Sequence, residues 1–363
     1  MHIPFVNLSR EAELFLPELL KKTEDVLKSG NYINGRNVKE LENKVAKYLN
    51  VKYVISVGNG SDALTFILRS LNLNNDDEII CPANSFIATA WAIIAAGAKP
   101  VFCDVDKDFL ININDFKRKV TSKTRAVIPV HLTGRVFDVH EIIDFCESEN
   151  IKIIEDAAQS FGAGKNKDFK TGTIGDAGAF SLHPLKNFAI YGDGGLITTN
   201  NQDIAKSCIL LRNHGLRNRD EAQIWGYNSR LDELQAGFLL IRLNSILEEN
   251  NKRRLLAKRY LKNLEAADLP ILLPNKYKLQ AEHSWHLFVI LTPMRDKLQN
   301  YLTLNNIETL LHYPVCPHKQ KALKDHPLSS LELPISEKIH RECLSLPISS
   351  IHNLKEIEFD LQY

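Results

Sequence analysis

One lysine in the chain, Lys186, has neighbours that suit chemistry. Small and apolar residues at 178–182 predict a buried strand, and Pro184 and Gly192 interrupt regular structure on either side of the lysine. We therefore expect Lys186 on a loop close to the end of a strand, with a return strand at 197–199. A lysine held in this way can lose its proton and form a Schiff base with a carbonyl cofactor. The alternative is a surface lysine in a hairpin.

A glycine-rich turn at 58–62 lies between an expected strand at 53–57 and an expected helix at 63–71. Free N–H groups at the start of a helix favour phosphate, and glycine lets a phosphate approach the backbone closely. The turn therefore predicts a phosphate site, and the alternative is a plain turn capped by Ser61 or Asp62. A dinucleotide fingerprint fits poorly, because it needs an acid after the next strand and here the acids precede that strand.

Strands and helices alternate along the first half of the chain. Strands are expected at 79–80, 100–104, 126–130 and 151–155, and helices at 84–97 and 139–149. This alternation predicts an α/β fold with a mostly parallel sheet covered on both faces. Ligands of such sheets gather at the carboxyl ends of the strands. Asp156 and Gln159 follow one of these ends and His131 follows another, so all three are candidate site residues.

Helical periodicity also marks the N-terminal region and the second half of the chain. Helices are expected at 11–28, 37–49, 203–212, 231–247 and, after a bend, 248–267. The basic cluster 252–254 is interpreted as a solvated helix face. A strand at 285–291 and a helix at 297–305 predict a second, smaller α/β domain in the C-terminal part.

Length and composition are those of a globular protein with about two domains: 363 residues, 44% hydrophobic and 25% charged. The formal net charge of +1 gives no reason to expect nucleic acid or a membrane surface as partner. The six cysteines are scattered without a C-x-x-C pair, which argues against a metal site or a disulfide framework. Since no signal peptide or membrane span is recognisable, we expect a cytoplasmic protein.

Taken in order, the motifs resemble those of the DegT/DnrJ/EryC1/StrS family of aminotransferases, which use pyridoxal 5'-phosphate (PLP) and act mainly on nucleotide-linked keto sugars. The resemblance covers residues 3–348, and it depends on the order of the motifs because each one alone is weak. The matching motifs are Gly58-Asn-Gly-Ser-Asp-Ala63, Ser85-Phe-Ile-Ala-Thr-Ala90, Glu155-Asp-Ala-Ala-Gln159, Phe180-Ser-Leu-His-Pro-Leu-Lys186, Gly192-Asp-Gly-Gly195, Arg212-Asn-His-Gly215, Gly226-Tyr-Asn-Ser-Arg230 and His312-Tyr-Pro-Val-Cys-Pro-His318.

The resemblance implies a PLP-dependent transferase of fold type I. In this α/β fold a large domain carries a seven-stranded, mostly parallel sheet, and a small C-terminal α/β domain follows it. We place the large PLP-binding domain at residues 1–247 and the small domain at 248–363, with an N-terminal segment that can pack on the small domain. The resemblance also implies a homodimer whose subunits share their active sites.

Several residues acquire cofactor roles from this resemblance. Lys186 falls on the position that forms the Schiff base with PLP. Asp156 falls on the acid facing the pyridine nitrogen, where a carboxylate keeps the ring protonated and improves it as an electron sink. Gln159 corresponds to the residue that hydrogen-bonds the ring hydroxyl, and Phe86 to the aromatic residue stacked on the ring. Without the resemblance, Asp156 would be interpreted as an acid at the end of a strand, Gln159 as a turn cap and Phe86 as a core residue. Glu155 should point to the opposite face of the sheet and is interpreted as structural.

Four residues correspond to contacts of the cofactor phosphate. Gly60, Ser61 and Ser181 match positions in the same subunit. Asn228 matches a residue that reaches the phosphate of the neighbouring subunit's cofactor; alone, it would be interpreted as a helix-start residue.

Substrate contacts are expected from two further motifs. His312, Tyr313 and His318 offer polar and aromatic groups that suit a hydroxylated ring. Arg212 and His214 could meet a phosphate or a carboxylate.

Three residues near the lysine motif bear on the type of reaction. Some relatives carry histidine in place of the lysine and act as dehydratases, but here His183 lies three residues before Lys186, which favours transamination. His183 is interpreted as a packing residue. Asp193 stands where glutamate is usual and Phe161 where histidine is frequent, and both departures concern the choice of substrate.

The implied reaction moves an amino group from an amino acid, glutamate by resemblance, to a keto sugar. The expected acceptor is a nucleotide-linked keto-deoxyhexose used for a surface glycan. Four alternatives are an aminotransferase acting on a small phosphorylated ketone, a PLP-dependent sugar dehydratase, a non-catalytic PLP-binding regulator and a nicotinamide enzyme. Lys186 argues against the dehydratase, and the presence of both Lys186 and Asp156 argues against the regulator. The nicotinamide enzyme is disfavoured because the acid that a dinucleotide site needs after the next strand is missing.

Overall fold

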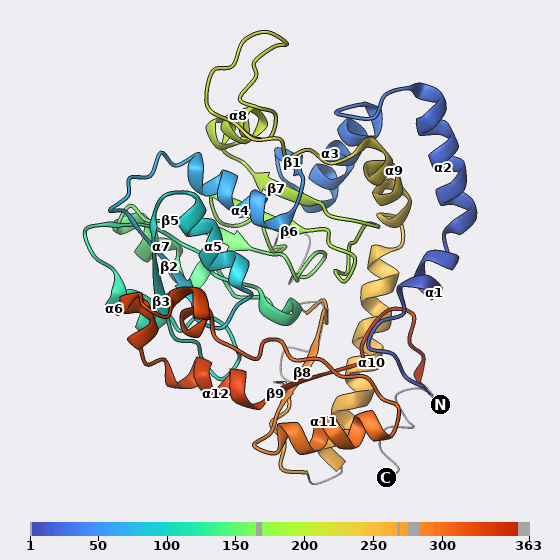
Figure 1. Cartoon of the computed structure of the whole chain (residues 1–363), viewed down its shortest axis with the longest axis vertical. Helices are drawn as coiled ribbons and strands as arrows, with labels where there is room; N and C mark the ends of the chain where they lie inside the picture. The colour runs from blue at the N-terminus through green and yellow to red at the C-terminus, as the bar shows by residue number, and fades with distance from the viewer. Residues whose placement is uncertain (1, 165–168, 267–268, 275–282, 355–363) are drawn as a thin grey trace.

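The structure of the protein is a computed structural model that describes residues 2–164, 169–266, 269–274 and 283–354. Its central sheet contains β1 (Tyr53–Val57), β2 (Glu78–Pro82), β3 (Lys99–Cys103), β4 (Thr124–Val127), β5 (Lys152–Asp156), β6 (Ala177–Ser181) and β7 (Gly195–Thr199). The strand order is β1-β7-β6-β5-β4-β2-β3 (Figure 1). β7 pairs antiparallel with β1 and β6, and the other neighbours pair in parallel. The predicted α/β fold with a seven-stranded, mostly parallel sheet is confirmed.

Helices cover both faces of this sheet. They are α3 (Arg36–Leu49), α4 (Gly60–Arg69), α5 (Ile87–Ala95), α6 (Ile113–Lys119), α7 (His140–Ser148), α8 (Gln202–Leu211) and α9 (Glu233–Arg242). Alternate residues of a strand point to opposite faces, and here both sets are apolar. Along β2, Ile79 joins the core shared with α4, α5 and α8, whereas Ile80 joins the core shared with α6 and α7. In β6, Phe180 joins a third core shared with α3 and α9.

Several of the predicted helices have different limits in the structure. The helix expected at 11–28 is divided into α1 (Leu8–Glu13) and α2 (Leu16–Ser29). The division follows from Pro17, which lies in the first turn of α2, where a missing N–H is tolerated, but would interrupt a continuous helix. The expected bend near 247 is the short turn between α9 and α10 (Ile246–Ala266). Among the described residues, no helix has the length and hydrophobicity needed to cross a bilayer.

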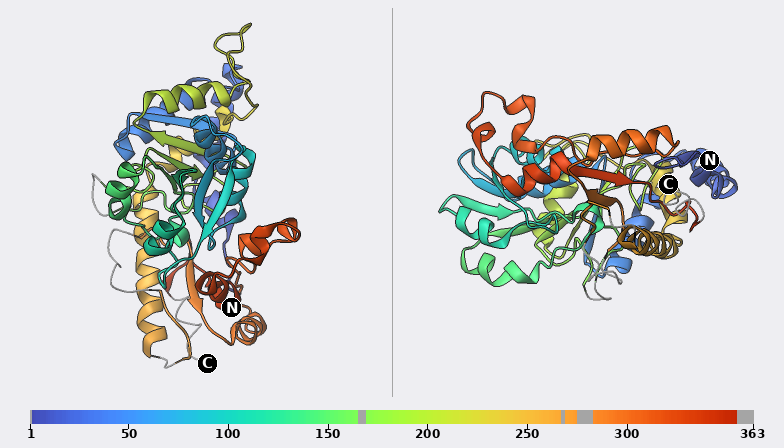
Figure 2. Two further views of the ribbon diagram at one scale, coloured as in Figure 1. Left: turned by 90° about the vertical axis from the view of Figure 1, so that its left-hand side faces the viewer. Right: turned by 90° about the horizontal axis from the view of Figure 1, so that it is seen from below.

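A second group of elements surrounds an antiparallel pair, β8 (Phe288–Leu291) and β9 (Cys343–Leu346). It includes α10, α11 (Arg295–Leu304) and α12 (Pro334–Glu342), and it lies at the end of the molecule away from α8 (Figures 1 and 2). Ile3 enters the same core and pairs with Ile307, so the N-terminal segment packs on this group. The predicted boundary after residue 247 lies in the first turn of α10, and the division into domains stays a prediction. Short 3-10 turns are found at Leu132–Gly134, Pro317–Lys319, Lys321–Leu323 and Pro327–Ser330.

The loop between α8 and α9 projects from the body of the molecule (Figures 1 and 2). Its two arms approach closely at the base, where a Cβ atom on Gly226 would lie 2.1 Å from the backbone nitrogen of Gly215. Beyond this crossing, Trp225 is 95% exposed. A tryptophan so fully exposed is unusual for a monomer and marks the loop as a surface available for contact.

Candidate active site

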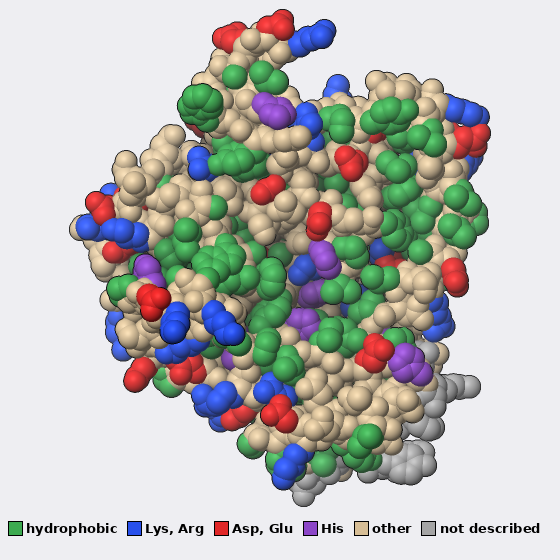
Figure 3. Space-filling view, in the orientation of Figure 1, with side chains coloured by type: hydrophobic (Ala, Val, Ile, Leu, Met, Phe, Trp, Pro, Cys, Tyr) green, Lys and Arg blue, Asp and Glu red, His purple; other side chains and the backbone are tan. Residues whose placement is uncertain are grey.

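A cavity of about 660 Å³ opens at the carboxyl ends of β5 and β6. Its walls come from the starts of α4 and α5, the loop after β6, and the segments around β8 and β9. His183, His286 and His312 line it. Figure 3 shows histidine side chains gathered at the middle of this face of the molecule. The cavity therefore lies at the position where ligands bind in open α/β sheets.

Asp156 ends β5 with its carboxylate buried in the wall of this cavity. Thr89 Oγ1 donates a hydrogen bond to Oδ2 at 2.8 Å, and the backbone N–H of Ala158 donates to Oδ1 at 3.2 Å. Burial raises the pKa of Asp156, while the bond from Thr89 acts in the opposite direction. A carboxylate fixed in this way favours a cationic or protonated group placed against it. Thr89 is a positioning residue that the sequence did not single out, although it lies inside the motif that starts at Ser85.

Lys186 lies on the loop after β6, as predicted, and lines the same cavity. Its backbone N–H donates to the carbonyl of His183 at 2.8 Å, which closes a turn around the lysine. Burial lowers the pKa of Lys186 to about 8, and the nearby charge of Asp156 opposes the shift. Roughly a tenth of a group with that pKa is neutral at pH 7, compared with well under 1% for an ordinary lysine. The side chain is therefore prepared to act as a nucleophile and a base.

The cofactor-free protein should reveal this pKa directly. Because only the neutral amine reacts with acetic anhydride, acetylation of Lys186 is expected to increase with pH and to reach half of its maximal rate near pH 8. Mass spectrometry of the peptide containing Lys186 after brief labelling at pH 6–11 measures this dependence. A midpoint above pH 10, where an ordinary lysine titrates, would contradict the depressed pKa.

A buried polar network holds the loop that carries the lysine. The side-chain amide of Asn187 donates to Asn250 Oδ1 at 2.8 Å and to the carbonyl of Ser284 at 2.9 Å. His286 Nδ1 lies 3.2 Å from Asn187 Oδ1. Since Asn250 belongs to α10 and Ser284 precedes β8, the second group of elements helps to fix the position of the loop that carries the lysine.

The glycine-rich turn at the start of α4 forms another part of the wall of the cavity. Asn59, rather than Ser61 or Asp62, caps the helix, with its Oδ1 accepting from the N–H of Asp62 at 2.8 Å. A Cβ atom on Gly60 would lie 2.8 Å from Cβ of Ser181, so the turn packs directly on β6. The N–H groups of Gly60 and Ser61 have no acceptor among the described residues. This arrangement fits a phosphate group.

Aromatic and amide side chains form the remaining walls. Phe86 caps α5 with an extended backbone, which is why this helix starts later than predicted, and its ring lies 5.3 Å from that of Tyr313. Gln159 Nε2 donates to Tyr313 Oη at 2.9 Å, and Gln159 Oε1 accepts from the N–H of Thr133 at 2.6 Å. Burial lowers the pKa of His312 to about 4, so its imidazole is neutral and can accept a hydrogen bond at physiological pH.

Three candidates lie outside this cavity. His318 is fully buried, with Nε2 3.2 Å from Glu337 Oε1, so its predicted contact with substrate is wrong. Arg212 pairs with Glu42 at 2.5 Å, which makes it structural rather than an anion-binding residue. Asn228 is exposed on the projecting loop and does not line the cavity of its own chain.

The structure also shows which of the other residues discussed above line the cavity and which lie in the core. His183 is exposed and lines the cavity, so its interpretation as a packing residue is wrong. Asp193 also lines the cavity, whereas Phe161 stacks on Phe188 with ring centres 4.3 Å apart, in the core. Glu155 is buried and accepts from three backbone N–H groups and from His131, which confirms that it is structural.

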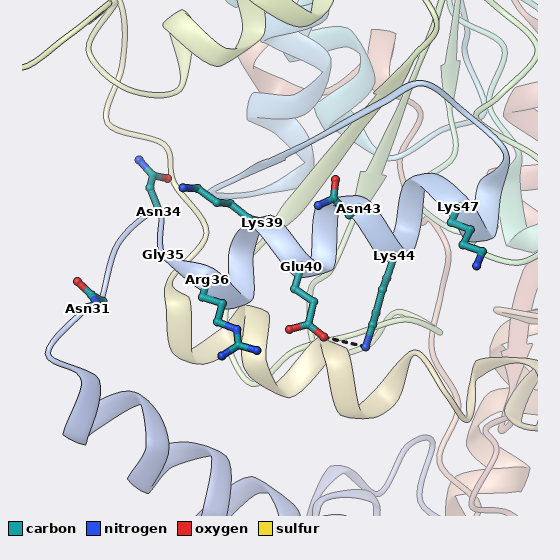
Figure 4. A pocket seen from close by; sticks show the side chains of 9 residues that line it. All are labelled: Asn31, Asn34, Gly35, Arg36, Lys39, Glu40, Asn43, Lys44 and Lys47. Atoms are coloured by element: carbon teal, nitrogen blue, oxygen red, sulfur yellow. Dashed lines mark ion pairs between the residues drawn. The ribbon is translucent and has the colours of Figure 1, made fainter.

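A larger hollow of about 840 Å³ runs along α3, but its side chains do not form a reactive centre. Arg36, Lys39 and Lys47 extend in different directions from the helix, and the acid Glu40 is paired with Lys44 (Figure 4). Charged residues spread along an exposed helix are most simply a solvated surface. The chemistry of this protein is therefore assigned to the cavity around Lys186.

The residues of that cavity fit PLP. A lysine with a lowered pKa, a buried carboxylate, a phosphate cradle and an aromatic side chain are the groups that hold this cofactor. These are the residues to which the resemblance gives cofactor roles, and those individual roles stay predictions.

Comparisons with known proteins agree with this geometry. The DegT/DnrJ/EryC1/StrS aminotransferase family matches residues 16–358. The chain is 42% identical over 360 residues to the dTDP-3-amino-3,6-dideoxy-alpha-D-galactopyranose transaminase of Aneurinibacillus thermoaerophilus, covering 98% of this chain and 97% of the relative. DesV of S. venezuelae, solved in complex with a ketimine intermediate, superposes with a TM-score of 0.95 at 34% identity, covering 99% and 96% of the two chains. NtdA of Bacillus subtilis, solved with bound cofactor PMP, superposes with a TM-score of 0.91 at 31% identity, covering 100% of this chain and 86% of the other. The protein is thus a PLP-dependent aminotransferase, and it belongs to the DegT/DnrJ/EryC1/StrS aminotransferase family.

Proposed function

We propose that this aminotransferase moves an amino group from glutamate to carbon 3 of a keto-deoxyhexose linked to a nucleotide, a precursor of a surface glycan. The observation that carries the reaction type is the convergence of Lys186 and Asp156 on one cavity beside a phosphate cradle. The identity to a relative named as a transaminase of a dTDP-linked 3-amino sugar supports the acceptor. The six described cysteines are all free and buried, which supports a reducing compartment such as the cytoplasm.

In this proposal each residue of the cavity has a separate task. PLP supplies the electron sink that stabilises negative charge on the donor's α-carbon. Lys186 Nζ would hold the cofactor and is placed to move a proton at that carbon. Asp156 keeps the ring nitrogen protonated, and Thr89 keeps Asp156 in place. Gly60 and Ser61 bind the phosphate through their N–H groups.

The remaining side chains orient the reactants. Ser181 adds a hydroxyl to the phosphate site. Phe86 would pack on the ring of the cofactor, and Gln159 would hydrogen-bond the ring hydroxyl. His312 and Tyr313 contact the sugar from the side of β9, where His312 Nδ1 bonds Ser345 Oγ at 2.8 Å.

The size of the acceptor provides the test of this function. A nucleotide offers binding energy far from the reacting carbon, so truncated substrates should react poorly. We expect kcat/KM for the free keto sugar, or for its monophosphate, to be lower by roughly 10²-fold or more than for the nucleotide-linked sugar. Mass analysis of the aminated products, with glutamate as donor, measures the rates. Equal rates with and without the nucleotide would favour the rival acceptor, a small phosphorylated ketone.

We also propose a homodimer in which each active site contains Asn228 of the other subunit. Asn228 lies on the projecting loop, outside the cavity of its own chain, and Trp225 exposes an apolar surface beside it. A symmetric pair of loops would place one asparagine in each site.

Subunit mixing tests this arrangement. Lys186→Ala and Asn228→Ala homodimers should both have low activity, since every site in them carries one lesion. In a mixed dimer one site carries both lesions and the other carries none, so activity should return toward a quarter of wild type after equal mixing. Mixing Lys186→Ala with Asp156→Asn subunits is the matched control. Each of these residues lines the cavity of its own chain, so every site of this mixed dimer still carries one lesion and activity should not return. Re-formed Lys186→Ala/Asn228→Ala dimers without activity would contradict the cross-subunit role.

A further inference from the structure

Arg253 lies in the middle of α10, in the basic cluster 252–254 that was expected to form a solvated helix face. That interpretation holds for Lys252, which is exposed and paired with Glu248 at 2.8 Å. It is wrong for Arg253, which is 6% exposed and lines the cavity that contains Lys186. Three residues earlier on the same helix, Asn250 holds the loop of the lysine, so one face of α10 reaches this site twice.

The guanidinium of Arg253 has no acid to balance its charge. Its Nη1 donates to the carbonyl oxygens of Ile348 at 2.9 Å and Trp285 at 3.4 Å, and among the described residues no carboxylate oxygen lies within 4.0 Å of it. Its Nε and Nη2 atoms have no acceptor among the same residues. The side chain therefore presents unused N–H donors while lining a cavity.

Two acids lie in the neighbourhood, but both are engaged elsewhere. Arg242 Nη2 pairs with Glu249 Oε2 at 2.8 Å, and Arg242 Nη1 pairs with Glu11. Ser245 Oγ occupies the second oxygen of Glu249 at 2.6 Å. These carboxylates favour a positive charge on Arg253 at longer range. Burial lowers the pKa of Arg253 only to about 10, so the charge persists at neutral pH.

A buried cation without a partner is costly unless a ligand supplies the opposite charge. A planar guanidinium with free N–H groups matches a carboxylate in a two-point, charge-assisted contact. The position of Arg253 distinguishes between two possible anions, the carboxylate of the donor and the diphosphate of the acceptor. In an amino acid donor a carboxylate is attached to the reacting carbon itself, whereas the sugar ring separates a diphosphate from the keto carbon and directs it away from Lys186. The buried location of Arg253 therefore suits the compact donor.

We propose that Arg253 binds a carboxylate of the amino donor and thereby holds the donor's α-carbon beside Lys186. This inference rests on the proposed function, in which glutamate is the donor. In this arrangement the two substrates are contacted from different elements: the acceptor from β9 and the donor from α10.

The two half-reactions separate this role from a structural one. Holoenzyme mixed with glutamate alone reports donor binding through the absorbance change of its cofactor. We expect Arg253→Gln to raise the glutamate concentration at half-saturation about 10²-fold and Arg253→Lys about 10-fold, because lysine keeps the charge but loses the fork. The reverse experiment starts from enzyme in the aminated form and adds the nucleotide-linked keto sugar, and there both variants should stay within about threefold of wild type. Lys252→Gln is the matched control and should resemble wild type in both.

A binding measurement without turnover completes the test. Glutarate carries the two carboxylates but no amino group, and calorimetry with the holoenzyme should show binding to wild type and to Lys252→Gln but a loss of about 10²-fold with Arg253→Gln. If Arg253→Gln does not fold, Arg253→Lys decides, since it retains a donor for the carbonyl of Ile348.

Three outcomes would overturn the inference: unchanged glutamate and glutarate binding in the variants, a defect confined to the acceptor half-reaction, or equal defects in both half-reactions. Wild-type enzyme that does not react with glutamate would instead refute the proposed donor, and the glutarate titration would then still decide on Arg253.

Discussion

Lys186→Ala should lower kcat by about 10⁴-fold, the upper end of what a positioned acid–base group contributes, and should also end covalent attachment of the cofactor. In the proposed mechanism both effects follow from one nitrogen, which would bind the cofactor and move the proton. Single-turnover kinetics measures the first effect. Borohydride reduction of wild type followed by mass spectrometry measures the second, and the mass of the cofactor should appear on the peptide that contains Lys186.

Lys170 offers a matched control for this variant. Burial lowers its pKa as well, but it bonds the carbonyl of Tyr48 and does not line the cavity. Lys170→Ala should therefore keep both activity and cofactor attachment. Attachment of the cofactor to any peptide other than the one with Lys186 would disprove the assignment.

Asp156→Asn should lower kcat by at least ~10²-fold, equivalent to about 2.7 kcal/mol of barrier. Asparagine keeps the shape of the side chain and can still accept the bond from Thr89, but it loses the charge that keeps a ring nitrogen protonated. Steady-state kinetics with saturating substrates measures the change. Near-normal kcat would remove Asp156 from the mechanism.

The adjacent acid provides the contrast. Glu155→Gln removes a carboxylate that accepts from the N–H groups of Gly172, Ile174 and Gly175, on the other side of the strand. We expect this variant to unfold at lower temperature while the folded fraction turns over normally. Two neighbouring carboxylates should thus have opposite consequences, one for chemistry and one for stability.

Much of the site was accessible from the sequence because it depends on local order. Asp156 is the last residue of a strand and Lys186 lies on the loop after another. The ends of strands can be predicted from short-range signals such as glycine and proline. Asp156 and Glu155 could even be assigned to opposite faces, because the side chains of a strand alternate. The sheet itself follows from the same alternation of strands and helices.

Residues whose role depends on distant packing could not be assigned in this way. The charges of residues 252–254 and their helical spacing do not show which face of α10 is covered by other segments. Arg253 is buried only because the segments around Trp285 and Ile348 pack on that face of α10. His318 shows the opposite error, since a pairing with Glu337, 19 residues later, removes it from the cavity.

The projecting loop also gives the protein an internal optical reporter. Of its three tryptophans, Trp285 is 1% exposed and Trp91 is partly buried, whereas Trp225 is 95% exposed. An indole surrounded by water emits at longer wavelength than an indole inside protein. Dilution should therefore shift the emission to the red if the loop is covered in the assembled enzyme, and a Trp225→Phe variant should lose that shift. The intrinsic fluorescence of the unlabelled protein could then follow the association of subunits at concentrations too low for sizing methods.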